Sequence, residues 1–157
     1  MAAKGKISRG ELAEEYFLEG YNCAQSVALA FADVVDLDKD TLLRAIAPFG
    51  GGMGRLREVC GAMSAVFAIL GLLEGYSTPE TGAPKLQLYA KVQELAAAFE
   101  RENGTLICRD LMGLTEKHDS PEPEPRTAEY YERRPCPGLV ASAANILQQY
   151  LETKDQQ

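Results

Sequence analysis

Apolar residues recur at intervals of three and four along most of this chain, and the most apolar stretch follows a glycine-rich loop. From Leu56 the pattern continues through Val59, Cys60, Met63, Phe67, Leu70 and Leu73. This spacing predicts a helix over about 56–74. The uninterrupted apolar run covers 15 residues, 59–73, which is shorter than the ~20 residues that span a bilayer. We therefore expect a buried central helix and no membrane span.

Glycines stand before and within this predicted helix. The loop ahead of it contains Gly50, Gly51, Gly52 and Gly54, and glycine tolerates positive φ and a close approach of the backbone to other atoms. Inside the helix, Gly61 and Gly71 each cost about 1 kcal/mol relative to alanine. We expect close packing to require both of them.

Three further helices are predicted before the loop. Their N-caps are Ser8, Asn22 and Asp38, residue types whose side chains accept hydrogen bonds from the first turn of a helix. The second helix is expected to run from Cys23 to about residue 35. Gly20 is expected to stop the first helix, and Pro48 to end the third.

After the central helix, Pro84 suits the first position of a long helix that ends at Asn103-Gly104. Thr105 is expected to cap one or two helical turns that contain Cys108. Residues 115–131 are polar and proline-rich, so we expect a surface loop there. The single histidine, His118, lies in this loop and is expected to be a solvated side chain outside any site.

The last helix is predicted to open at Cys136, with Pro137 at its first position, and to run to about Leu151. Residues 152–157 are then expected to form a disordered tail. No segment alternates over the length of a strand. The sequence therefore predicts an all-α, single-domain helical bundle, residues 1–157, with five to seven helices around the buried helix at about 56–74.

Charge narrows the range of partners. The chain has 16 basic and 23 acidic residues and a net charge of −7, with no basic block to neutralise a row of phosphates, so nucleic acid is not an expected partner. The first residues are too charged for a signal peptide, so a cytoplasmic location is expected. Apolar residues on more than one face of the first and fifth helices, such as Tyr16 beside Phe17, suggest a homodimer.

The candidate chemistry lies in four cysteines: Cys23, Cys60, Cys108 and Cys136. They are 37, 48 and 28 residues apart and form no Cys-x-x-Cys pair, yet each falls near the beginning of a predicted helix. A helix N-terminus stabilises a nearby anion, which favours the thiolate form of a cysteine. If the four starts converge, zinc or an iron–sulfur cluster would supply the neutralising cations. Two disulfides, four buried cysteines acting as small apolar residues, and helix starts that meet for packing alone are the alternatives.

The cysteine pattern resembles the family of redox-active proteins named for its C_GCAxxG_C_C pattern. The resemblance rests on Cys23, on Cys60-Gly-Ala after Gly-Gly-Gly-Met-Gly-Arg, on Cys108 within Cys-x-x-Leu-Met-Gly, and on Cys136. It covers the chain from Tyr16 to Leu147. Ala65 stands where the family pattern has a glycine.

A similar four-cysteine domain, as the resemblance implies, forms the iron–sulfur part of split-Soret cytochromes. The chain has no Cys-x-x-Cys-His, so no c-type haem is expected. The resemblance implies that the four cysteines are ligands and that Gly50, Gly51, Gly52 and Gly54 form the adjoining loop.

Three functions are compatible with this pattern. The first is a small redox protein in which Cys23, Cys60, Cys108 and Cys136 bind an iron–sulfur cluster, [2Fe–2S] by preference, for electron transfer to a partner protein or for redox sensing. The second is a thiol–disulfide redox protein without a cofactor. The third is a structural Zn(Cys)4 interaction module. We expect an electron carrier or redox module rather than a stand-alone catalyst.

Overall fold

The computed structural model describes residues 7–79 and 82–155, and within them the chain is an all-α protein. Six α-helices in this part of the chain have seven residues or more: α1 (Arg9–Leu18), α2 (Cys23–Leu29), α3 (Lys39–Ile46), α5 (Gly61–Glu74), α6 (Ala83–Asn103) and α9 (Cys136–Asp155). Shorter elements are the 3-10 turn η2 (Ala47–Phe49), α4 (Gly50–Met53), α7 (Cys108–Leu111) and α8 (Ala128–Arg133). The expected fold class is confirmed.

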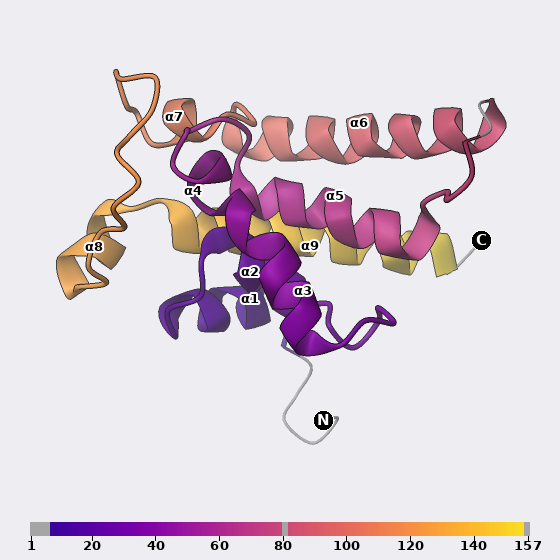
Figure 1. Ribbon diagram of the computed structural model, residues 1–157, viewed down its shortest axis with the longest axis horizontal. Coiled ribbons are helices and arrows are strands. Elements are labelled where there is room, and N and C mark those ends of the chain that lie inside the picture. The colour runs from indigo at the N-terminus through magenta and orange to yellow at the C-terminus, as the bar shows by residue number, and fades with distance from the viewer. Residues whose placement is uncertain (1–6, 80–81, 156–157) are drawn as a thin grey trace.

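Helix α5 is the central element of the bundle. It packs against α2, α6 and α9, while α1 packs against α9 and α2. Figure 1 shows α5 running between α6 and α9, with α1, α2 and α3 gathered along one side. The same view shows that α5 and α9 both begin at the end of the bundle where the short helices α4, α7 and α8 lie.

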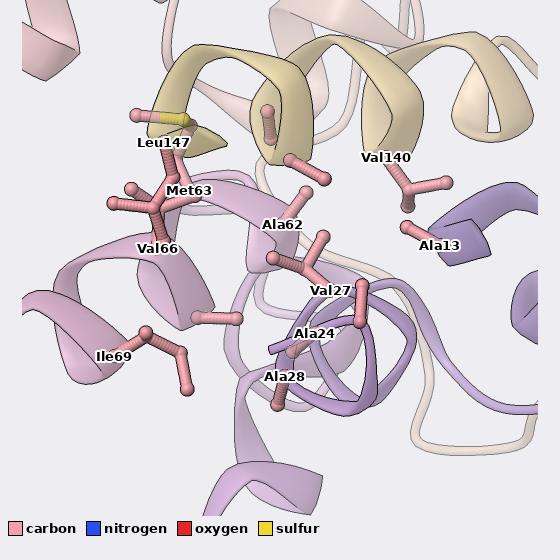
Figure 2. Close-up of a cluster of buried hydrophobic side chains, with 14 of the residues drawn as sticks. Ala13, Ala24, Val27, Ala28, Ala62, Met63, Val66, Ile69, Val140 and Leu147 are labelled. Carbon is pink, nitrogen blue, oxygen red and sulfur yellow. The ribbon is translucent and has the colours of Figure 1, made fainter. Parts of the chain in front are cut away.

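The core forms where α5 meets α2 and α9 (Figure 2). Met63, Val66 and Ile69 of α5 are fully buried, as are Val27 of α2 and Leu147 of α9. Alanines fill the space where the helices come closest, namely Ala13, Ala24, Ala28 and Ala62. Because dense packing of this kind leaves little room to adjust, the position of α5 determines where its first residue lies.

The three caps predicted before the loop are present. The side chains of Ser8, Asn22 and Asp38 each accept a hydrogen bond from the backbone N–H three residues later, at 3.0, 2.8 and 2.9 Å. Each cap satisfies a donor that the helix itself leaves without a partner. Local sequence therefore set these three helix beginnings.

Three helix ends differ from the sequence prediction. Helix α2 stops at Leu29 rather than near residue 35, because the hydrogen bonds tighten to a three-residue spacing after it, and Val34 is therefore 38% exposed instead of facing inward. Helix α9 continues to Asp155, so the expected tail is helical over 152–155, and residues 156–157 lie outside the described residues. Helix α5 begins at Gly61 rather than near Leu56, because residues with positive φ precede it.

No helix in the two described stretches is long and apolar enough to cross a membrane. Helix α6 leaves apolar side chains in solvent, with Leu86 71% and Tyr89 52% exposed. The homodimer stays a prediction, and light scattering above the monomer mass of 17.1 kDa is the result it requires.

The far end of α5 is tied to its neighbours by one carboxylate. Glu74 accepts hydrogen bonds from Tyr150 (2.9 Å) and Lys154 (2.8 Å) of α9 and from Lys91 of α6. Burial would raise the pKa of this carboxyl, but the hydrogen bonds from Lys154, Lys91 and Tyr150 outweigh it and lower the pKa from 4.5 to about 2. The folded chain therefore holds the ionised form, and α5, α6 and α9 meet around it.

The Glu74→Gln substitution should lower the free energy of unfolding, and the loss relative to wild type should be larger at neutral pH than at acidic pH. Because the pKa is lower in the folded chain, the stabilisation is complete above pH 4.5 and disappears as the pH falls towards about 2. We expect a loss of about 1–2 kcal/mol at pH 7, allowing for solvent screening, and a smaller loss at pH 3, measured by urea unfolding. Glu94→Gln, at an exposed position of α6, is the control. Equal losses for Glu74→Gln at both pH values would contradict this account.

Candidate four-cysteine site

All four cysteines line a cavity of about 210 Å³, and all four are free thiols. Cys23, Cys108 and Cys136 are the first residues of α2, α7 and α9, and Cys60 is the N-cap of α5. The other lining residues are Phe17, Asn22, Gly50, Gly51, Arg55, Arg57, Gly61, Leu111, Met112, Pro123, Glu124, Arg126, Tyr130, Arg134 and Leu139. The predicted convergence of four helix beginnings is confirmed.

Cys60 and Cys108 are brought together by a short backbone pairing. Val59 and Ile107 form an isolated antiparallel bridge, and the N–H of Cys60 donates to Leu106 O at 2.8 Å. The N–H of Cys108 donates to Glu58 O at 2.6 Å. This pairing joins segments almost 50 residues apart in the chain, and the local sequence pattern does not predict it.

The glycine loop forms a left-handed turn. Gly51, Gly52 and Gly54 have φ of 70°, 68° and 61°, and Met53 and Arg55 between and after them have φ of 71° and 69°. Non-glycine residues cost roughly 1–2 kcal/mol each in this conformation, so glycine at three of the five positions limits the strain. A right-handed helix cannot begin inside such a turn, which is why α5 does not start near Leu56.

The loop glycines have different surroundings. Gly50 and Gly51 line the cavity. Gly52 lies directly against Cys108, since a Cβ on Gly52 would be 2.6 Å from the Cβ of Cys108. A Cβ on Gly54 would meet nothing within 4 Å, so only its positive φ favours glycine there.

The two glycines of α5 also differ. A Cβ on Gly61 would lie 2.6 Å from Cys23 Sγ and 2.5 Å from Phe49 O, as the expectation of close packing requires. A Cβ on Gly71 would meet nothing within 4 Å, so for Gly71 that expectation was wrong.

Two buried arginines, which the sequence analysis did not single out, complete the cavity wall. The Arg57 side chain is 3% exposed, and its Nη1 donates to Cys108 Sγ at 3.5 Å and to Met112 Sδ at 3.6 Å. The Arg134 side chain is 9% exposed, and its Nη1 donates to Met112 Sδ at 3.0 Å. The sequence feature that could have identified them is their closeness to the cysteines: Arg57 precedes Cys60 by three residues, and Arg134 precedes Cys136 by two.

The segment expected to be a surface loop also contributes to the site. Arg126 lies over the ring of Phe17 at 4.3 Å and donates to the carbonyl oxygens of Phe17 (2.9 Å) and Tyr21 (3.0 Å). Asp119 accepts from the Nε of Arg57 at 2.8 Å. His118 is exposed, as expected. The segment therefore carries exposed residues but is anchored at the cavity, and its last part forms α8.

The family model described as "Putative redox-active protein (C_GCAxxG_C_C)" matches residues 21–150, a range that includes all four cysteines. The chain belongs to this family. Comparisons with curated proteins and with solved structures gave no match.

In this C_GCAxxG_C_C protein, burial dominates the electrostatics of three of the thiols. Burial raises the pKa of Cys23 and Cys60, and it raises the pKa of Cys136 to about 12. The backbone N–H groups of Gly51 and Ala24 lower the pKa of Cys23, but less than burial raises it. The N–H groups at the helix starts therefore favour the thiolate form, as expected, but burial outweighs them. Thiolates form in this cavity when additional positive charge compensates for the lost solvation.

The cavity has more room than a single ion requires. Its volume of about 210 Å³ is far more than the roughly 15 Å³ that one water needs. Within the described residues, no three His, Cys, Asp or Glu side chains are arranged to hold a single metal ion. The lining combines four thiols with the guanidinium groups of Arg57 and Arg134.

Two substitutions in α5 should separate the effect of close packing at the cysteine site on stability from the effect of helix propensity: Gly61→Ala and Gly71→Ala. We expect Gly61→Ala to lower the free energy of unfolding by about 1–3 kcal/mol, because the new methyl overlaps Cys23 Sγ and Phe49 O. Gly71→Ala should be neutral or raise it by up to about 1 kcal/mol, since its Cβ enters open space. Chemical denaturation of the metal-free proteins measures both. Similar values for the two variants would contradict the close contact between α5 and Cys23.

Proposed function

We propose that this C_GCAxxG_C_C protein binds an iron–sulfur cluster, [2Fe–2S] by preference, through Cys23, Cys60, Cys108 and Cys136, and acts in electron transfer or redox sensing. The supporting observation is that four free thiols from four helix beginnings line one cavity. Four cysteine thiolates are the usual ligand set of such clusters. When bound, the cluster would supply one-electron chemistry, and the electron would be exchanged with a partner protein.

A structural zinc ion is the weaker alternative. Zinc is held by four ligands at about 2.0–2.3 Å, which requires the ligand side chains to meet around one point. In the described parts of the chain, no three side chains of the types that bind metals do so. A cavity of about 210 Å³ lined by all four cysteines favours a cluster over a single ion.

Thiol–disulfide exchange without a cofactor is also less well supported. Exchange begins with attack by an accessible thiolate on a disulfide of the substrate. Cys60 and Cys108 are only 5% and 8% exposed, and Cys23 Sγ lies against the backbone of Gly61. Cys60 and Cys108 at least are therefore suited to ligation rather than to contact with a protein substrate.

The chain's own residues would hold and shield the cluster. The N–H groups at the starts of α2 and α5 lie beside Cys23 and Cys60 and would stabilise their thiolate forms once these are ligated. The glycine loop and the segment anchored by Arg126 line the cavity and would limit the access of water. Limited access and nearby N–H donors are two of the features that determine cluster potentials.

Anaerobic purification and reconstitution with iron and sulfide test this proposal. Wild type should absorb between about 400 and 600 nm and contain iron and sulfide in equal amounts, with little zinc. Single Cys→Ala variants at the four positions should lose most of this absorption and iron. His118→Ala is the control for adventitious binding, because His118 is exposed and does not line the cavity. Stoichiometric zinc, or wild-type protein without iron, would refute the cluster.

A further inference from the structure

Two guanidinium groups converge on one sulfur atom at the cavity wall. Arg57 Nη1 donates to Met112 Sδ at 3.6 Å, and Arg134 Nη1 donates to the same atom at 3.0 Å. Arg57 Nη1 also reaches Cys108 Sγ at 3.5 Å. Like charges rarely approach one another inside a protein without an anion between or beside them. A thioether is only a weak acceptor for such donors.

Each guanidinium has a carboxylate partner on another of its nitrogens. Arg57 donates through Nε to Asp119 at 2.8 Å, and Arg134 donates through Nη2 to Glu124. In both residues the carboxylate binds one nitrogen, while Nη1 is directed at sulfur. The pairing therefore fixes the orientation of each guanidinium and leaves its Nη1 available to a stronger acceptor in the cavity.

We propose that Arg57 and Arg134 are positioning residues that donate hydrogen bonds to the sulfur atoms of the bound cluster and raise its reduction potential. This inference rests on the proposed function. Reduction takes one electron from the partner protein and adds one negative charge to the cluster, with no bond made or broken in the protein. Fixed positive charges and N–H donors to sulfur stabilise that added charge more than the oxidised state.

A purely structural role would have a different consequence. Arg57, through Asp119, and Arg134, through Glu124, also hold the segment that forms part of the cavity wall. If that were their whole contribution, their loss would lower stability and leave the potential of the remaining loaded protein unchanged. The midpoint potential therefore separates the two roles.

The test compares midpoint potentials of reconstituted wild type with those of Arg57→Gln and Arg134→Gln. We expect each variant to shift the equilibrium against reduction about tenfold, which is about 59 mV for a one-electron couple. Arg57→Lys keeps the charge and should recover part of the shift. Arg101→Gln is the control, because Arg101 lies at an exposed position of α6 and does not line the cavity. The reduction equilibrium constant of this control variant should stay within about twofold of the wild-type value.

The outcomes separate the inference from the function it rests on. Wild type that takes up no cluster overturns the proposed function and this inference with it. Wild type that loads a cluster, with glutamine variants of unchanged potential, overturns the inference alone. Thermal unfolding of the metal-free proteins reports the structural effect of each change. If Arg57→Gln does not fold, Arg134→Gln decides, and an unchanged potential in that variant refutes the proposal.

Discussion

The close approach of α5 to α2 is the contact on which the site depends. Position 61 must be glycine for this contact, because a methyl group there would overlap Cys23 Sγ and Phe49 O. Since α5 is packed among α2, α6 and α9, its first turn cannot shift to make room. The same packing that buries Met63 thus determines how near Cys60 lies to Cys23.

The left-handed turn before α5 links this contact to the rest of the cavity. It stops the chain from entering a helix near Leu56 and allows residues 58–60 to pair with 106–108. Arg57 itself has φ of 59°, a conformation that costs free energy for a residue with a Cβ. Hydrogen bonds from Glu58 N to Gly52 O (2.9 Å) and from Arg57 to Asp119 compensate for part of that cost.

The electrostatic balance of the cavity differs from that of the whole protein. The chain carries a net charge of −7, yet Arg57, Arg126 and Arg134 line the cavity beside the thiols. Burial works against ionised cysteines there, and cations are what make four thiolates tolerable. The three arginines supply positive charge beside the thiols in the same small volume.

The sequence by itself determined the features that depend on neighbouring residues. The caps at Ser8, Asn22 and Asp38, the helical periodicity and the places of Cys23 and Cys136 at helix beginnings follow from residues within one or two turns. Only the tertiary structure decided the start of α5, the bridge between Val59 and Ile107, and the burial of Arg57 and Arg134. These depend on contacts between residues far apart in the chain, because the left-handed turn and the backbone pairing with 106–108 together override the helical pattern of 56–60.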